Sequence, residues 1–231
     1  MRQQIVEFAF QGNYSFANFH PGGNEQLYAE LVNFAQGGPE QQIYLWGEAG
    51  SGKTHLMHAC CQLAKQHGRE CFYLNLTPPM PADTGLLYGL EEWDLVCLDN
   101  IQHLAEQAEW QQALFAFYNA HRQNSRQLLI TADCPPKYLP FGLLDLKTRM
   151  AWGLTLKIQA LDDVNLTLAL SRKAGDLGFE LSPRVASYLL RHYPHDLPAL
   201  WKILEKLDQA TLAAQRKVTI PFLKQILENG E

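Results

Sequence analysis

The sequence predicts an α/β fold: a mainly parallel sheet of about five strands with helices on both faces, followed by a small all-α domain. Short apolar runs alternate with amphipathic helical segments over the first 160 residues. Strands separated by helices are joined by crossovers, so they pair in parallel. Beyond that point the pattern is helical only. We expect a tail over residues 1–12, an α/β domain over 13–160 and a helical domain over 161–231.

Each element is predicted by its own local pattern. The expected strands are the short apolar runs 43–46, 71–76, 95–98, 128–131 and 152–158. The expected helices are 24–34, 54–67, 107–124, 143–150, 166–173, 183–193, 197–212 and 220–227. Ser182, followed by Pro183, is a start signal for the helix 183–193, and Thr219 is one for the helix 220–227.

The charge distribution argues against a nucleic-acid-binding module. The formal net charge is −5; residues 1–159 hold 10 basic and 15 acidic residues, and residues 160–231 hold nine of each. A domain that binds nucleic acid usually carries a basic excess. We therefore expect no direct sequence-specific DNA binding.

The cysteines and the apolar runs predict a cellular location. The five cysteines show no metal-ligand spacing, so we expect free thiols in a reducing cytosol. No basic segment followed by an apolar run opens the chain, and no apolar stretch reaches the ~18 residues that a membrane span needs. We expect a soluble cytoplasmic protein without membrane contact.

The segment from Gly47 to Thr54 fits G-x-x-x-x-G-K-[ST] and lies between an apolar strand and an amphipathic helix. Its glycines let backbone N–H groups surround a phosphate chain, and the helix N-terminus adds positive potential. Lys53 would reach the terminal phosphates and the Thr54 hydroxyl would ligate Mg²⁺. The candidate nucleotide-binding residues here are Glu48, Ala49, Gly50, Ser51, Gly52, Lys53, Thr54 and His55.

A second magnesium anchor is expected at the end of a neighbouring buried strand. Asp99 follows the apolar run 95–98 and fits that role. The next residue is Asn100, whose amide can orient a water molecule but cannot take its proton. We therefore expect the chain to bind a nucleoside phosphate with Mg²⁺ and to hydrolyse ATP weakly or not at all by itself.

Taken in order, the motifs resemble the AAA+ module of the DnaA family of bacterial replication proteins, and within it the shorter Hda branch, the regulatory inactivators of DnaA. The resemblance covers the chain from about Tyr14 onward. The matching segments are Tyr14–Phe19 as an opening box, Leu98–Gln102 as Walker B, Leu128–Asp133 as sensor 1 and Leu146–Leu154 as box VII. The resemblance implies an AAA+ sheet followed by a helical lid.

The resemblance also implies roles for residues around the nucleotide. Phe19, His20 and Pro21 would lie near the base, and Asp133 would be the polar probe of sensor 1. Pro198 falls where the family places its sensor 2 arginine. Loss of that contact to a γ-phosphate favours ADP or another nucleoside diphosphate as the resident ligand, with ATP as the alternative. The base selectivity stays open.

Arg149 falls on the arginine finger of box VII, which in this family enters a neighbour's nucleotide site. A guanidinium placed there neutralises charge on the transferring phosphoryl group. The local pattern alone leaves a second interpretation open, a structural arginine paired with Asp145 or another carboxylate.

Three departures from the initiator favour the Hda branch. The chain ends at Glu231, where the initiator continues into a helix-turn-helix. The segment Asn75–Ile101 contains no Lys or Arg, where the initiator carries a basic insertion, and Asn100 replaces an acidic residue.

The tail resembles a sliding-clamp-binding peptide, with Gln3, Val6 and Phe8 as its contacts. A disordered tail or an extra edge strand is the alternative.

The resemblance thus implies a negative regulator of DNA replication initiation. Nucleotide-bound and tethered to the DNA polymerase III beta sliding clamp, it would present Arg149 to ATP held by DnaA and activate that partner's hydrolysis. The alternatives are a self-sufficient AAA+ ATPase such as a helicase loader, and a DNA-binding initiator paralogue. A homodimer also stays open.

Overall fold

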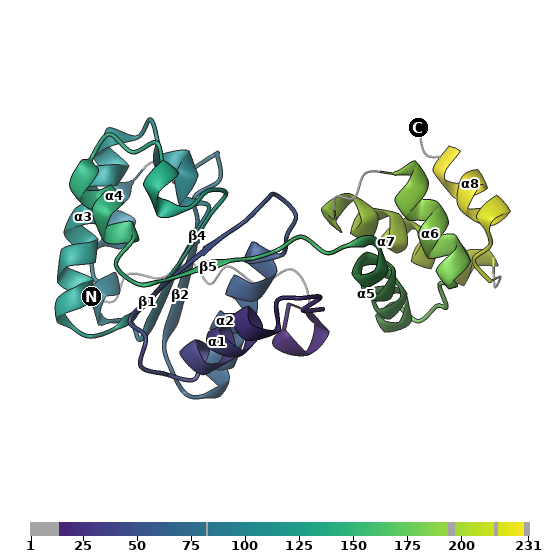
Figure 1. Ribbon diagram of the computed structural model, residues 1–231, viewed down its shortest axis with the longest axis horizontal. Helices are drawn as coiled ribbons and strands as arrows, with labels where there is room; N and C mark the ends of the chain where they lie inside the picture. Colours follow the sequence, from purple (N-terminus) through teal and green to yellow (C-terminus); the bar gives the residue numbers. More distant parts are fainter. Residues whose placement is uncertain (1–13, 82, 194–196, 215–216, 229–231) are drawn as a thin grey trace. The chain divides into compact units, whose positions relative to one another are not determined.

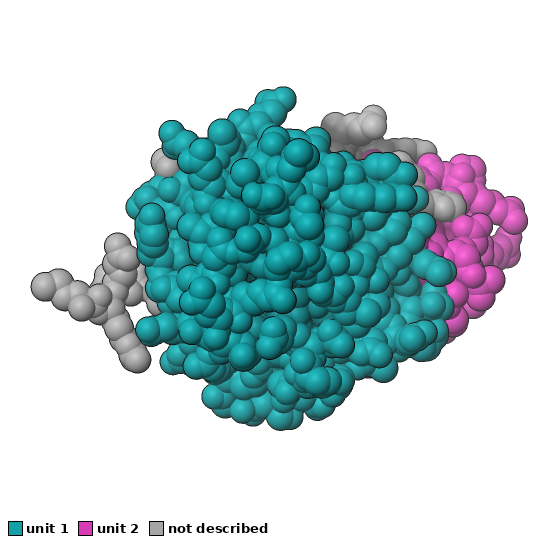
Figure 2. All heavy atoms as spheres, turned by 60° about the vertical axis from the view of Figure 1, so that its left-hand side comes forward, with its two compact units in different colours: residues 1–48, 52–159 teal, residues 49–51, 160–231 magenta. Residues whose placement is uncertain are grey.

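A computed structural model describes residues 14–81, 83–193, 197–214 and 217–228. They form two compact units, shown in Figure 2. The first comprises the described residues up to Glu48 together with Gly52–Gln159. The second comprises Ala49–Ser51 and the described residues from Ala160 onward.

The first unit is built on a five-stranded sheet in which every neighbouring pair of strands is parallel. The strands are β1 (Gln42–Trp46), β2 (Cys71–Asn75), β3 (Leu95–Asp99), β4 (Gln127–Ala132) and β5 (Leu154–Lys157), in the order β2-β3-β4-β1-β5. The predicted parallel sheet is confirmed. Because all the strands run the same way, the loops that follow them meet at one edge of the sheet.

Helices cover both faces of the sheet, as predicted (Figure 1). α1 (Glu25–Ala35) and α2 (Lys53–Gln66) lie on one face, and α3 (Ala108–Gln123) and α4 (Leu144–Met150) lie on the other. Short 3-10 turns fill the connections. They span Phe16–Asn18, Thr84–Leu87, Leu90–Glu92, Ile101–Leu104 and Pro136–Tyr138.

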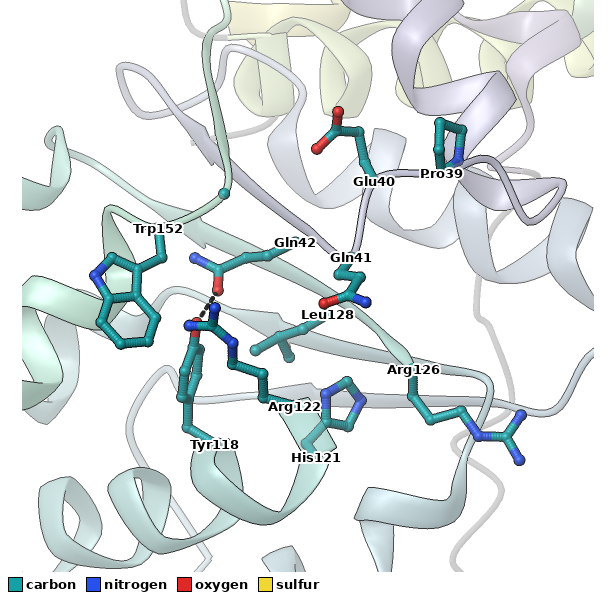
Figure 3. Close-up of a pocket in the computed structure, with 11 residues that line it drawn as sticks. Pro39, Glu40, Gln41, Gln42, Tyr118, His121, Arg122, Arg126, Leu128 and Trp152 are labelled. Carbon is teal, nitrogen blue, oxygen red and sulfur yellow. Dashed lines mark hydrogen bonds between the residues drawn. The ribbon is translucent and has the colours of Figure 1, made fainter. Parts of the chain in front are cut away.

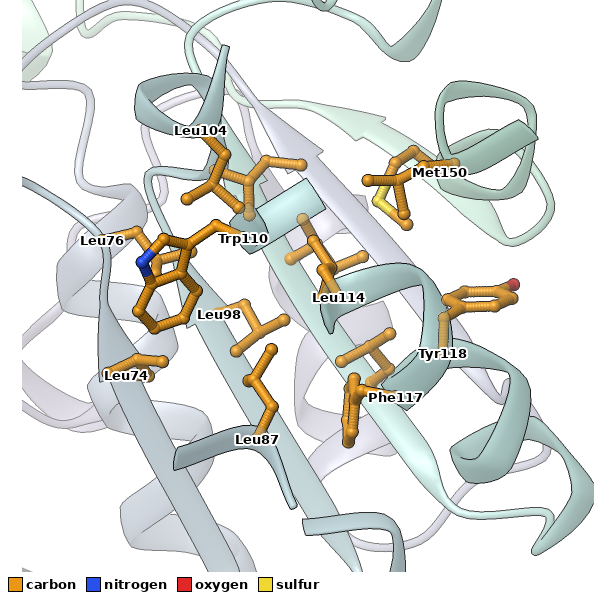
Figure 4. Packing of buried hydrophobic residues seen from close by; sticks show 14 of the residues in the cluster. Leu74, Leu76, Leu87, Leu98, Leu104, Trp110, Leu114, Phe117, Tyr118 and Met150 are labelled. Carbon is orange, nitrogen blue, oxygen red and sulfur yellow. The ribbon is translucent and has the colours of Figure 1, made fainter. Parts of the chain in front are cut away.

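Each face of the sheet has its own hydrophobic core. On the α3 side, Trp110, Leu114 and Phe117 project from one stripe of the helix onto β2, β3 and β4 (Figure 4). On the other side, Leu56, Met57 and Cys60 of α2 pack against α1 and the sheet. Burial of large apolar side chains contributes about 1.5–3 kcal/mol each, so these two layers fix α2 and α3 against the strands.

The second unit has its own core and contains α5 (Asp163–Asp176), α6 (Pro183–His192), α7 (Leu197–Ala214) and α8 (Ile220–Glu228). The predicted start signals are confirmed. The Ser182 hydroxyl accepts a hydrogen bond from the backbone N–H of Val185, and the Thr219 hydroxyl accepts one from that of Phe222. No helix in the described part of the chain is both long and apolar enough to cross a membrane.

Candidate nucleotide site

The loop from Gly47 to Thr54 leaves the carboxyl end of β1 and leads into α2. Gly50 and Gly52 have φ angles of 73° and 100°, a backbone region that L-side chains rarely adopt. A Cβ atom on Gly52 would also lie 3.0 Å from a ring carbon of Phe19. The positive φ angle therefore favours glycine at position 52, and the close approach of the Phe19 ring adds to that preference.

Lys53 is buried at the first position of α2. Its Nζ donates hydrogen bonds to the carbonyl oxygens of Gly47 and Glu48, both at 2.8 Å. Burial lowers the pKa of Lys53, and the negative charges of Asp99 and Asp133 oppose that effect. The ammonium group is thus held inside the loop that the sequence predicts will surround a phosphate chain.

Asp99 is fully buried at the end of β3 and collects hydroxyl donors from three other elements. Thr54 Oγ1 donates to its Oδ2 at 2.7 Å, Tyr73 Oη donates to the same oxygen at 3.0 Å, and Thr131 Oγ1 donates to Oδ1. The structure therefore brings together Thr54 and Asp99, the two predicted magnesium ligands. A hydroxyl beside a carboxylate supplies the hard oxygen donors that Mg²⁺ prefers.

Tyr73 and Thr131 were not predicted from the sequence. Their signal lies in the register of the parallel sheet, because Asn75 pairs with Asp99 and places Tyr73 two residues back on the neighbouring strand. Thr131 lies on β4, the other neighbour of β3. Polar residues near the ends of strands that flank an acidic residue are therefore candidates, once the strand order is known.

Asn100 adopts a left-handed conformation with a φ angle of 64°, which Asn tolerates better than most residues. Its backbone N–H donates to Thr131 Oγ1 at 2.9 Å, and its Nδ2 donates to Asn75 Oδ1 at 3.2 Å. The side-chain amide is therefore engaged with β2. Asp133, the predicted sensor 1 probe, is exposed beyond the end of β4, and Thr131 is the β4 residue in contact with Asp99.

The segment predicted to lie near the base packs against the start of α2. Phe19 is 8% exposed, and its ring lies 5.4 Å from that of His55. His55 Nε2 is 2.9 Å from the carbonyl oxygen of Ser15. His20 and Pro21 follow Phe19 and are partly exposed. The opening box therefore adjoins the P-loop helix, with Phe19 forming part of the core beneath Gly52.

The other end of the sheet carries Arg149, in the last turn of α4. Its guanidinium lies over the ring of Phe115 at 4.3 Å, with Trp152 at 5.4 Å and Tyr118 at 5.7 Å. The part of the chain that the structure describes gives Arg149 no carboxylate partner. The alternative in which Arg149 pairs with Asp145 is not what the structure contains; aromatic rings support the cation instead.

Gln42, the first residue of β1, holds the backbone at this position. Its Nε2 donates to the carbonyl oxygens of Arg149 at 3.2 Å and Met150 at 3.0 Å, and its Oε1 accepts from Tyr118 Oη at 2.7 Å. A Cβ atom on Gly153 would lie 2.2 Å from the Gln42 carbonyl oxygen, so only glycine fits there. Buried hydrogen bonds and close packing thus fix the end of α4 against β1.

A cavity of about 260 Å³ lies beside Gln42, at the amino ends of the strands (Figure 3). Its lining includes Tyr118, His121 and Arg122 of α3, together with Trp152. The Arg122 guanidinium lies 4.2 Å from the Trp152 ring, which is 52% exposed. A second cationic side chain therefore stands beside Arg149.

Several predicted site residues lie outside the described residues. They are Gln3, Val6 and Phe8, the candidate clamp contacts. Pro198 lies in the first turn of α7, but its side chain is outside the described part of the chain.

The fold and the site together define a class. A P-loop follows the first strand of a parallel sheet of order β2-β3-β4-β1-β5, an acidic residue ends β3, and a helical unit follows: this is the architecture of an AAA+ protein. Residues 86–157 match the family described as the bacterial DnaA ATPase domain, and residues 162–227 match the Hda lid domain. These two matches, together with the fold, support an Hda-like AAA+ protein homologous to DnaA.

Solved structures show the same fold. Domain III of the replication initiation protein DnaA from Thermotoga maritima is 20% identical, with a TM-score of 0.79 over 94% of this chain and 96% of that one. DnaA from Aquifex aeolicus bound to AMPPCP is 23% identical, with a TM-score of 0.70 over 86% and 65%. The Holliday junction branch migration motor RuvB from T. maritima is 16% identical, with a TM-score of 0.70 over 94% and 72%.

Proposed function

We propose that this chain is a negative regulator of DNA replication initiation that stimulates hydrolysis of ATP bound to DnaA, with Arg149 as an arginine finger acting in trans. The observation that carries the proposal is the setting of Arg149: a cation on an aromatic support, without a carboxylate partner among the described residues. Such a guanidinium is available to an external anion without first breaking an ion pair.

The position of Arg149 supports action on a second molecule. Gln42 binds the backbone of Arg149 at the start of β1, whereas the P-loop follows the end of that strand. A five-residue strand spans roughly 15 Å, more than one arginine side chain can bridge while it rests on Phe115. This separation supports a role for Arg149 on a nucleotide held by another molecule.

In this proposal, the chain holds its own nucleotide and hydrolyses it only weakly. ADP or another nucleoside diphosphate would lie in the loop around Lys53, and Thr54 and Asp99 would hold Mg²⁺, which would neutralise phosphate charge. Asn100 supplies no general base, and its amide is engaged with Asn75. Hydrolysis by the isolated chain should therefore be weak. Phe19, His20, Pro21, His55, Asp133 and Pro198 remain proposed neighbours of the nucleotide.

The tail completes the proposal. Gln3, Val6 and Phe8 would bind the DNA polymerase III beta sliding clamp and so confine the activity to clamp loaded on DNA. Removal of residues 1–8 should abolish clamp retention while nucleotide affinity is unchanged. Retention of the truncated chain on the clamp would remove the tail from the proposal and leave the Arg149 role intact.

The central experiment reconstitutes ATP-loaded DnaA, clamp, DNA and this protein, and follows nucleotide hydrolysis. Arg149→Ala should lower the stimulated rate by about 10³-fold or more, the range seen for arginine fingers in GTPases. Arg122→Ala is a matched control, because it removes a neighbouring cation that also rests on an aromatic ring. Equal stimulation by Arg149→Ala and wild type would refute the finger assignment.

The rival enzyme function gives the opposite result in a simpler assay. A self-sufficient AAA+ ATPase would turn over ATP without DnaA, and Lys53→Ala would abolish that turnover. Under the proposal, the isolated protein retains nucleotide and releases little phosphate. Turnover by the isolated chain comparable to the reconstituted rate would favour the rival.

A further inference from the structure

Three buried cysteines from three different elements meet beneath the nucleotide site. Cys61 lies on α2, Cys71 on β2 and Cys97 on β3. Their Sγ atoms all lie within 4.8 Å of one another, and those of Cys61 and Cys97 are 3.4 Å apart. Cys61 and Cys97 are fully buried and Cys71 is 7% exposed. The spacing along the chain carries no ligand motif; the topology alone assembles this thiol triad.

The thiol triad is tied to the nucleotide site through α2 and β3. Thr54 and Cys61 are seven residues apart on α2, two turns along one face of the helix. Cys97 and Asp99 are two residues apart on β3 and point to one face of the sheet. The helix and the strand therefore meet twice, through the Thr54–Asp99 hydrogen bond and through the Cys61–Cys97 contact.

β2 repeats the pattern. Cys71 and Tyr73 are two residues apart on the same face of the strand, and the Tyr73 hydroxyl donates to Asp99. Each of the three elements thus supplies one thiol to the lower layer and one oxygen group to the upper layer. A change in the spacing of the thiol layer would be transmitted along rigid elements to Asp99.

The geometry of the triad fits a soft cation. Metal–sulfur bonds of about 2.3 Å in a three-coordinate site place the sulfur atoms about 4 Å apart, close to the separations in the triad. Among the described residues, no fourth histidine, cysteine or carboxylate joins the group. Structural zinc sites almost always take four ligands, whereas Cu(I) is a soft cation for which thiolates are preferred ligands and three are sufficient.

The surroundings favour a thiolate at Cys71, whereas the pKa values of Cys61 and Cys97 are raised, so those two thiols would lose their protons only on metal binding. The pKa of Cys71 is lowered because the Cys61 and Cys97 thiols hydrogen-bond to it, with help from the positive charges of Lys65 and Arg69. A thiolate is the form of cysteine that binds metal. Each further Cu–S bond would release one thiol proton, and no electron would be transferred.

We propose that Cys61, Cys71 and Cys97 bind a single Cu(I) ion, and that the occupied site alters nucleotide affinity by cross-linking α2, which follows the P-loop, to β3, which ends at Asp99. This site goes beyond the regulatory function proposed above. Its test does not use DnaA, the clamp or Arg149, so the two proposals succeed or fail separately.

The test titrates the reduced full-length protein with Cu(I) under anaerobic conditions, in competition with a colorimetric Cu(I) chelator. We expect one ion per chain, a thiolate-to-copper charge-transfer band in the ultraviolet, and three Cu–S bonds by X-ray absorption. Cys61→Ala and Cys71→Ala should each weaken binding at least about tenfold. Cys60→Ala is the matched control, because Cys60 is a buried thiol on the same helix outside the triad.

Two results would overturn the site. If Cys60→Ala weakens Cu(I) binding as much as Cys61→Ala does, the ion binds elsewhere. If Cys61→Ala and Cys71→Ala both bind Cu(I) with unchanged affinity, the triad is excluded as the site. Thermal unfolding of the variants separates loss of ligand from loss of fold. If Cys61→Ala is unfolded, Cys71→Ala, at the first residue of β2, decides the question.

The coupling has its own readout. Saturation of the wild type with Cu(I) should change nucleotide affinity by about fivefold or more, the lower end of usual coupling between sites. Cys71→Ala should show no such change at the same copper concentration. Copper binding with unchanged nucleotide affinity in the wild type would refute the coupling.

Discussion

The two ends of the central sheet differ in how their charged groups are satisfied. At the carboxyl end, Lys53 is surrounded by carbonyl oxygens and Asp99 by three hydroxyl groups. At the amino end, Arg149 rests on aromatic rings without a carboxylate partner in the described part of the chain. One end holds its charges within the protein, and the other presents a charge outward.

Under the proposed function, this difference separates nucleotide binding from the action of Arg149 within one domain. A closed hydrogen-bond network is costly to disturb, because a buried polar group left without a partner costs about 1–3 kcal/mol. A partly exposed cation on an aromatic support, such as Arg149, loses little when it turns to an external anion. The carboxyl end suits a ligand that stays bound, and the amino end suits a transient encounter.

Among substitutions that test this difference between the two ends, the largest effect, a loss of nucleotide affinity, is expected at Lys53. Lys53→Ala removes the cation of the P-loop and should weaken nucleotide binding by about 100-fold or more, since charge-assisted hydrogen bonds contribute about 1.5–3 kcal/mol each. Isothermal titration with ADP measures the effect. Lys65→Ala, an exposed position on the same helix, is the control. Unchanged ADP affinity in Lys53→Ala would disprove the assignment of the phosphate site.

The next effect concerns Gln42 at the opposite end. Gln42→Ala leaves the Tyr118 hydroxyl and two backbone carbonyl groups without their partner, and should lower the free energy of unfolding by about 1–3 kcal/mol. The stimulated hydrolysis of DnaA-bound ATP should fall about tenfold as Arg149 loses its fixed backbone. Denaturant unfolding measures the first quantity, and ADP affinity should not change.

Gln41→Ala is the matched control, because Gln41 is the exposed neighbour of Gln42. If Gln42→Ala is destabilised and still stimulates hydrolysis like Gln41→Ala, Gln42 supports the fold and does not position Arg149.

Much of the nucleotide end could be predicted from the sequence, because its signals are local. The P-loop is one continuous segment, and Asp99 directly follows an apolar run, so pattern and spacing identify both. The predicted strands and helices lie within a few residues of the observed ones for the same reason. The expected parallel sheet follows from the alternation of strands and helices.

Contacts between segments that are distant in the sequence could not be predicted without the fold. Thr131 contacts Asp99 because β4 lies beside β3, an order that the sequence analysis did not predict. Phe115, which lies 34 positions before Arg149 in the sequence, supports its guanidinium, and the thiol triad joins three elements whose spacing along the chain is uninformative. Contacts of this kind depend on strand order and helix packing, which single-sequence periodicity does not encode.

An effect confined to acidic pH is expected from His121, which lines the cavity at the amino end. Burial, with a contribution from Arg126, lowers its pKa from 6.5 to about 4. Between these values the unfolded chain binds a proton that the folded chain does not, so stability rises with pH in this window. We expect the free energy of unfolding to fall by up to about 1.4 kcal/mol per pH unit from pH 6.5 to 4.

The variant His121→Gln should remove this part of the pH dependence, as measured by denaturant unfolding at several pH values. His103→Gln, at an exposed histidine, should keep the wild-type slope. If His121→Gln and wild type lose stability in parallel as the pH falls, His121 is not the group responsible.

The smallest effect tests the aromatic support itself. Phe115→Leu keeps apolar bulk beneath Arg149 and removes the ring whose face attracts the cation. An exposed cation–π contact is worth about 0.5–1 kcal/mol, so the stimulated hydrolysis rate should fall about two- to fivefold. Phe115→Tyr should retain the wild-type rate, because its ring keeps the same attraction. If Phe115→Leu matches Phe115→Tyr, the backbone hydrogen bonds from Gln42 are sufficient to position Arg149, and the aromatic rings only cover its side chain in the absence of a partner.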